Sequence, residues 1–139
     1  MQEAEVKIKV KLNNTEDPQR VIHAVSNVVK CEGPVILESV SGKFMIFQGT
    51  GKEFLSPLRR LLHEQRILSA ARRVVKKGLR DGIFHFCLNK QAAFANQVSF
   101  SEEKEESPLG SIVFEIKTRD PEAFLDWLTQ RRRGGSVAG

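Results

Sequence analysis

The stretch EVKIKVKL at residues 5–12 alternates apolar and charged side chains without a break. One face of this segment carries valine, isoleucine and leucine, and the other carries glutamate and lysine. A period of two is typical of a β-strand with one buried and one solvent-exposed face. The stretch therefore predicts an antiparallel sheet that is covered on one side only, because sheets covered on both sides have continuously apolar strands.

An Asp-Pro pair follows a strand pattern twice, at Asp17-Pro18 and at Asp120-Pro121. Asp accepts hydrogen bonds from the free N–H groups of a first helical turn and Pro fits its first position, so each pair predicts a helix start. The tetrapeptides TEDP and TRDP that contain these pairs leave two explanations open. They are either an internal duplication of a strand–helix unit or two independent uses of a common helix start.

Further strands are expected where short apolar segments are bounded by turn residues, at 35–40, 43–47, 83–88, 97–100 and 112–116. The sequence thus predicts an α+β fold, with a mostly antiparallel sheet and helices packed on one face. The chain has 139 residues, of which 40% are hydrophobic, which is enough for one core. We expect a single domain over residues 1–130 and a flexible tail over 131–139.

The composition argues against secretion, membrane insertion, metal binding and enzyme chemistry. No apolar run approaches the roughly 20 residues of a membrane span, and the N-terminus lacks a secretion segment. Cys31, Cys87 and the three histidines show no ligand spacing for a metal. The chain also lacks a phosphate loop, a dinucleotide turn and a nucleophile elbow. These features predict a cytoplasmic protein that is not an enzyme and holds no cofactor or metal.

The excess positive charge is concentrated between residues 59 and 80. The whole chain has 22 Lys and Arg against 17 Asp and Glu, a net charge of +5. The segment 59–80 has eight basic residues and one acidic residue, so its net charge is +7 and that of the remainder is −2. Ser56-Pro57 fits a helix start and Gly78 is the next helix breaker, so one helix about 30 Å long is predicted over 57–77.

A continuous helix would place several basic side chains in one narrow sector of its surface: Arg59, His63, Arg66, Arg73 and Lys77. We expect Arg59, Arg66, Arg73 and Lys77 to bind the phosphates of RNA or another polyanion. The alternative is a solvated outer face, which the helical spacing of Arg60 and Glu64 favours. The apolar side rotates around the same helix, which indicates two packing partners, the sheet and a second subunit.

The segment LNKQAAF at 88–94 places Asn89, Lys90 and Gln91 between two apolar strands. These side chains have several donors and could recognise a ligand, which would reopen the question of an enzyme. The simpler interpretation is a connection in which the amide side chains satisfy backbone groups at a bend.

Five motifs combine along the chain: TEDP at 15–18, QRILSAARR at 65–73, LNKQAAF at 88–94, SPLGSI at 107–112 and FLDWL at 124–128. Together they resemble the archaeal uncharacterised protein family numbered 0201. Two positions depart from the family's usual pattern, Ser69 where Asp is common and Ser111 where Pro is common.

The resemblance implies a fold similar to that of the large-subunit ribosomal protein that binds 5S RNA. It also implies a homodimer. Members of the family are often described as RNA-binding, but the family has no established activity. The motif residues Gln65, Asn89, Lys90 and Gln91 form a polar cluster for which no known role can be carried over. Two functions follow as hypotheses: non-sequence-specific RNA or polyanion binding through the basic helix, or a dimeric structural or assembly module that binds no nucleic acid.

Overall fold

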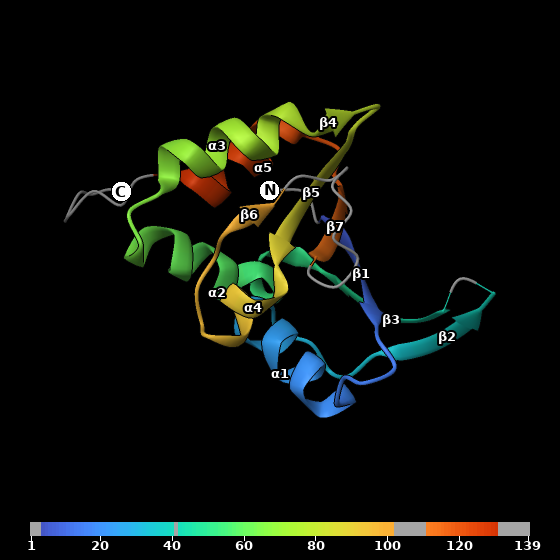
Figure 1. Ribbon diagram of the computed structural model, residues 1–139. Helices are drawn as coiled ribbons and strands as arrows, with labels where there is room; N and C mark the ends of the chain where they lie inside the picture. The colour runs from blue at the N-terminus through green and yellow to red at the C-terminus, as the bar shows by residue number, and fades with distance from the viewer. Residues whose placement is uncertain (1–3, 41, 102–110, 131–139) are drawn as a thin grey trace.

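A seven-stranded antiparallel sheet and five helices make up the computed structural model, which describes residues 4–40, 42–101 and 111–130 (Figure 1). The strands are β1 (Glu5–Leu12), β2 (Val35–Ser39), β3 (Gly42–Thr50), β4 (Leu79–Arg80), β5 (Ile83–Asn89), β6 (Phe100–Ser101) and β7 (Ser111–Lys117). The helices are α1 (Pro18–Val28), α2 (Gly51–Glu64), α3 (Leu68–Lys77), α4 (Lys90–Phe94) and α5 (Pro121–Thr129). The predicted α+β class is confirmed.

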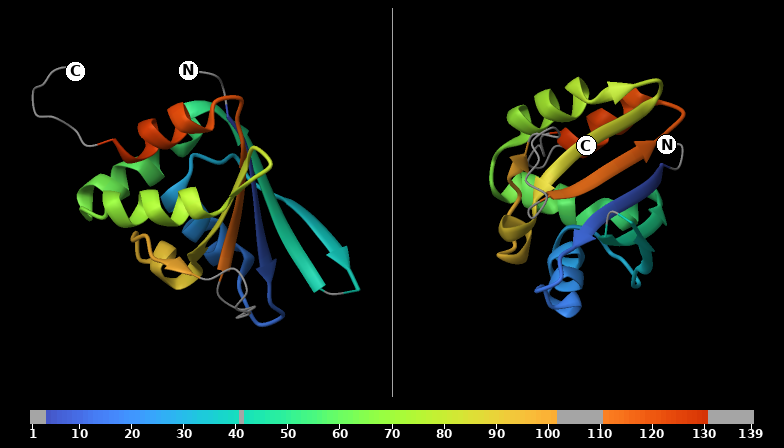
Figure 2. Two further views of the ribbon diagram at one scale, coloured as in Figure 1. Left: turned by 90° about the horizontal axis from the view of Figure 1, so that it is seen from above. Right: turned by 45° about the vertical axis from the view of Figure 1, so that its right-hand side comes forward.

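The alternating first strand lies in the middle of the sheet, whose strand order is β2-β3-β1-β7-β5-β4, with β6 paired to β5. Its apolar side chains are buried and its charged ones face outward. In register, Ile8 lies opposite Phe47 of β3 and Phe114 of β7, so the buried rows of three strands meet on one face. The helices lie on this face, and the other face of the sheet has no helix over it in the described residues (Figure 2).

Both predicted Asp caps are confirmed. The carboxylate of Asp17 accepts from the N–H of Gln19 at 3.0 Å, and that of Asp120 accepts from Ala123 at 3.1 Å. A side chain at the cap thereby satisfies a first-turn donor of α1 and of α5. The core beneath the helices is built from large side chains with no exposed surface, among them Phe47, Phe84, Phe114, Phe124, Leu55 and Leu62.

Helix α2 begins at Gly51, directly after Thr50, the last residue of β3. Gly51 has φ 86°, a left-handed value that lets the strand turn sharply into the helix. Pro57 lies inside the helix and lacks the N–H that would bond to the carbonyl of Glu53. The hydroxyl of Ser56 donates to that carbonyl at 3.0 Å instead, which explains why the helix continues through the proline.

The single helix predicted over 57–77 is wrong, because the segment forms α2 and α3 with a turn centred on Arg66. Arg66 has φ 59°, in the left-handed region. Its N–H donates to the carbonyl of His63 at 3.1 Å, and the N–H of Ile67 donates to that of Leu62 at 3.2 Å. These two bonds make a Schellman motif, which usually has Gly in the left-handed position. An arginine thus ends the helix without the Gly or Pro on which the prediction relied.

Three short segments also differ from the prediction. Residues 90–94 form the helix α4, the strand expected at 97–100 is reduced to β6, and the two-residue strand β4 was not expected. Elements this short give no reliable periodicity. The acidic stretch before Ser107, most of the SPLGSI motif and the predicted tail lie outside the described residues. Among the residues that are described, no helix is both long and apolar enough to cross a membrane.

Candidate nucleic-acid interface

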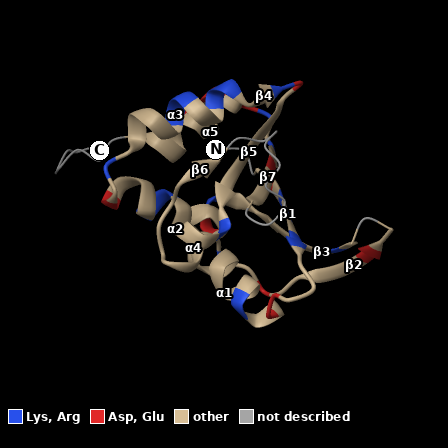
Figure 3. Ribbon diagram, viewed as in Figure 1, with Lys and Arg blue, Asp and Glu red and all other residues tan. Residues whose placement is uncertain are grey.

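The outer face of α3 carries a row of exposed cations: Arg66, Arg73, Lys76 and Lys77. We call this row the α3 cationic face. Arg73 and Lys77 are one helical turn apart, and Arg66 precedes the helix at its N-terminal end. No acidic residue occurs between 66 and 80, and none of the four makes an ion pair with any residue that the structure describes (Figure 3). No described carboxylate therefore neutralises the positive charge of this face by direct pairing.

A hollow of about 730 Å³ lies at the joint between α2 and α3. Arg66 and Arg73 line it together with the first turn of α3, including Ser69. No side chain caps that first turn, and the turn contains no Asp or Glu. Its free N–H groups and the positive end of the helix dipole therefore add to the positive charge of the two guanidinium groups. The hollow suits an anion that accepts several hydrogen bonds.

The opposite side of α3 is fixed to its own chain. Ala71 and Val75 are fully buried, and Arg72 pairs with Asp126 of α5 at 2.9 Å and donates to Thr129 at 3.2 Å. The apolar sector of α3 thus packs in the core, so the second subunit inferred from the rotated apolar side is not needed there. Because the buried side of α3 is held by the core and by α5, the α3 cationic face lies on the solvent side of the helix.

Arg59 does not belong to the α3 cationic face. Its Nε donates to the carbonyl of Trp127 at 2.7 Å, and its guanidinium lies 5.3 Å from the centroid of the indole ring. His63 lies beside it, with Nδ1 2.9 Å from the carbonyl of Arg59 and Nε2 2.7 Å from that of Gln130. Both side chains tie α2 to α5. We therefore remove Arg59 from the residues proposed to bind phosphate.

Arg59→Ala is expected to lower the free energy of unfolding by about 1–2 kcal/mol, because it removes a charge-assisted hydrogen bond and a cation–π contact. Affinity for RNA should stay within twofold of the unmodified chain. Urea denaturation and an RNA titration on the same preparation measure the two effects. A large loss of affinity at unchanged stability would return Arg59 to the binding surface.

The polar cluster expected around the 88–94 motif is not a single site. Gln65 donates to the carbonyl of Val98 at 3.0 Å and accepts from its N–H at 2.7 Å, so its amide holds the α2–α3 joint against the segment before β6. Asn89 accepts from the N–H of Ala92 at 2.9 Å and caps α4. Both amides satisfy backbone groups, and Gln91 is exposed to solvent.

Lys90 is the buried member of that cluster, with 7% of its side chain exposed. Its ammonium donates to the carbonyl of Lys11 and to both carboxylate oxygens of Glu16, each at 3.0 Å. Burial alone would raise the pKa of Glu16, but hydrogen bonds from Asn13 and Lys90, together with the charge of Lys90, lower it. Every donor contact of Lys90 is internal, which makes it a structural residue that locks α4 to the β1–α1 connection.

Comparison with known proteins places these features in a family. A family model described as "RNA binding" matches residues 5–118. The UPF0201 protein of Pyrobaculum arsenaticum is 39% identical over 95% of this chain and 93% of its own length. That of Sulfurisphaera tokodaii is 37% identical over 92% and 88%. The chain belongs to the UPF0201 family.

Solved structures agree with the assignment. The UPF0201 protein of Methanococcus jannaschii has a TM-score of 0.74 and 31% sequence identity, and the alignment covers 97% of this chain and 99% of that one. A second UPF0201 structure has a TM-score of 0.75 at 27% identity. The α+β fold described above is therefore that of the UPF0201 family. Only the family model names RNA binding; the relatives and structures given above are named as UPF0201 proteins without a function.

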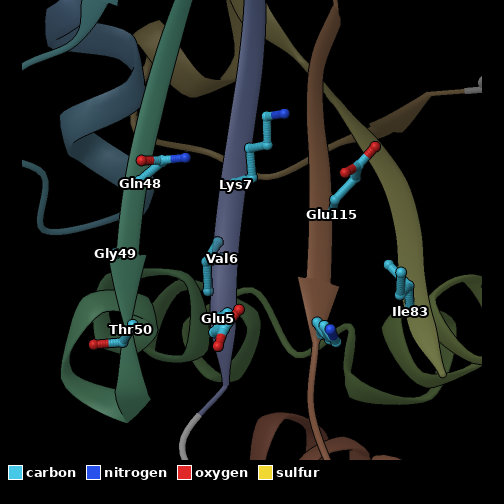
Figure 4. A pocket seen from close by; sticks show the side chains of 9 residues that line it. Glu5, Val6, Lys7, Gln48, Gly49, Thr50, Ile83 and Glu115 are labelled. Atoms are coloured by element: carbon cyan, nitrogen blue, oxygen red, sulfur yellow. The ribbon is translucent and has the colours of Figure 1, made fainter.

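Two other hollows of this UPF0201 protein are poorer candidates. One of about 490 Å³ lies on the helix-free face of the sheet, over β3, β1, β7 and β5 (Figure 4). Its charges balance, since Lys7 and Lys117 face Glu5 and Glu115. It therefore offers a polyanion no net attraction.

The other hollow, of about 500 Å³, lies beside Lys90 and Gln91. Its charged groups already have partners: Lys90 pairs with Glu16, Asp17 caps α1, and the guanidinium of Arg20 lies 4.5 Å from the centroid of the Phe94 ring. Within the described ranges, no three His, Cys, Asp or Glu residues lie close enough to hold a metal ion.

Proposed function

We propose that this UPF0201 protein binds the phosphate groups of RNA or of another polyanion. The binding involves no catalysis and no recognition of the bases. The binding residues are Arg66, Arg73 and Lys77, together with Lys76. One observation carries the proposal: three exposed cations of α3 and Arg66 in the turn before it form one row, with no acid between residues 66 and 80. The RNA-binding description of the family model supports it, because the match includes this whole segment.

The chemistry of the face favours phosphates over bases. Arginine donates in a fork that matches two phosphate oxygens, and lysine contributes a mobile point charge. The α3 cationic face contains no aromatic residue on which an unpaired base could stack. Contacts to the backbone alone fix position and carry no sequence information. Similar affinity for single strands of different sequence is therefore expected.

The test is a titration of a labelled single-stranded RNA with the double variant Arg73→Glu/Lys77→Glu. Losing two charge-assisted contacts of about 1 kcal/mol each should weaken binding roughly 30-fold. The matched control is Lys7→Glu/Lys9→Glu, which makes the same charge change on the exposed face of β1. Its affinity should fall by less than threefold.

Equal losses in the two double variants would show that only the net charge of the protein matters. The α3 cationic face would then have no special role. A third variant, Ser69→Asp, adds a carboxylate to the hollow between Arg66 and Arg73 without removing a cation. We expect it to weaken binding by about fivefold through local electrostatics, and an unchanged affinity would remove the hollow from the site.

A homodimeric structural or assembly role is the second candidate function. The observation that favours it is a cluster of exposed apolar side chains on β2 and the turn after it: Val35, Ile36, Leu37 and Val40. Contiguous exposed apolar patches commonly mark interaction sites. Sedimentation or light scattering over a range of concentrations measures the oligomeric state. A monomer at every concentration would exclude this role.

A further inference from the structure

Strand β2 is an edge strand, and no other described element covers either of its faces. All five of its residues are exposed, and the exposed fractions are 63% for Val35 and 51% for both Ile36 and Leu37. Val40, in the turn that follows, is fully exposed. The β2–β3 hairpin extends past the helices, away from the body of the domain (Figures 1 and 2). One row of β2 backbone N–H and C=O groups therefore has no strand beside it in the described residues.

Edges of this kind are usually protected by proline, by an inward-facing charge or by a bulge, because they pair readily with other strands. Strand β2 has the sequence VILES and contains none of these devices in its first three residues. Its one charge, Glu38, is already paired with Lys43 of β3 at 3.6 Å. An apolar edge strand of this kind is better suited to pairing with another strand than to exposure to solvent.

The distribution of charge favours the hairpin as the place where a second copy of the same chain could pack. A net charge of +5 makes two copies repel each other, most strongly at the α3 cationic face. The hairpin contains one acidic and one basic residue between 35 and 50, so it is electrically neutral. The repulsion between two copies is therefore smallest when they meet at the hairpin, where apolar burial favours association.

We propose that β2 pairs antiparallel with β2 of a second copy about a twofold axis, which gives the dimer of the preceding subsection a defined surface. Full overlap of the five residues places Leu37 opposite its own counterpart and Val35 opposite Ser39. Glu38 then faces Ile36 and not another carboxylate. Two more apolar residues, Phe44 and Ile46 of β3, lie in register beside Leu37 and Val35 and widen the buried strip.

The arrangement has a consequence for binding. Helix α3 packs on β5, four strand positions from β2, so pairing at β2 places the two β5 strands nine positions apart. At about 4.8 Å per strand, the two cationic faces lie roughly 40 Å apart at opposite ends of one sheet. A polyanion long enough to reach both would gain affinity through avidity.

Disulfide trapping tests the register. In the paired sheet the Cα atoms of opposite residues are about 5 Å apart, which a disulfide can span. Leu37→Cys should therefore form a covalent dimer on mild oxidation. Val35→Cys is the matched control, since residues 35 of the two copies would be about 13 Å apart and should not cross-link. Equal cross-linking of the two variants, or none in either, overturns the proposed pairing.

Sedimentation separates this surface from dimerisation itself. Ile36→Lys should raise the dissociation constant of the dimer at least tenfold, whereas Gln91→Lys, the same new charge on an exposed site of α4, should not change it. If both variants dimerise as tightly as the unmodified chain, the protein is a dimer but β2 is not its interface. A chain that is monomeric throughout would overturn both.

Discussion

Gly78→Ala should destabilise the protein by about 3 kcal/mol, at the upper end of the cost of overpacking. Gly78 follows α3 and connects it to β4, and a Cβ added there would overlap the carbonyl oxygen of His85. That atom belongs to the backbone of β5, which is itself paired with β7, so it cannot move aside like a flexible side chain. The clash would displace either the sheet or the helix that carries the cationic face.

The matched control for this prediction is Gly82→Ala. Gly82 has φ 79°, and a Cβ there would meet no atom within 4 Å, so its cost is limited to left-handed strain of about 1 kcal/mol. Urea denaturation of the two variants measures the difference. If Gly78→Ala loses no more stability than Gly82→Ala, the close approach of α3 and β5 is not a constraint on this fold.

Lys90→Met should destabilise the protein by about 2–3 kcal/mol. The substitution leaves the carboxylate of Glu16 and the carbonyl of Lys11 without their shared donor. Breaking a fully buried pair costs about 3–5 kcal/mol, and Glu16 retains 27% side-chain exposure, so water recovers part of the loss. Lys30→Met is the control, because its ion pair with Glu53 is exposed and should contribute less than about 1 kcal/mol.

The same pair predicts a dependence of stability on pH. The pKa of Glu16 is lowered in the folded chain from its ordinary value of 4.5. Its contribution is therefore fully present above that value and is lost as the pH falls through the lower folded value. Urea denaturation from neutral to acidic pH should show a smaller acid loss in Lys90→Met than in Lys30→Met. Identical acid losses would show that Lys90 does not stabilise the Glu16 carboxylate.

Local rules predicted the local features correctly. The alternation in β1 and the two Asp-Pro helix starts depend on residues close in sequence, and the structure confirms them. The joint at Arg66 was missed because its left-handed turn is stabilised by contacts that sequence spacing does not encode. Those contacts are the packing of the half-buried Ile67 against the core and the pairing of Gln65 with Val98, 33 residues away.

The candidate site was predicted only in part, because sequence spacing does not reveal long-range contacts. Charge density correctly located the basic segment, but a helical projection across the break grouped Arg59 with Arg73 although they lie on different helices. The partner of Arg59 is Trp127, 68 residues further along the chain, and no local pattern indicates that contact. Gly78 was predicted to end the helix, and the structure confirms it as the C-terminal cap of α3. Its close contact with the backbone of β5 joins segments that no local pattern connects.

The most direct measurement of the central claim is the salt dependence of RNA binding. Each phosphate contact to a single strand contributes about −0.7 to the slope of log K against log salt concentration. If the α3 cationic face makes these contacts, Arg73→Glu/Lys77→Glu should reduce the magnitude of the slope by at least about 1.4 relative to Lys7→Glu/Lys9→Glu. Equal slopes for the two double variants would contradict phosphate binding at this face.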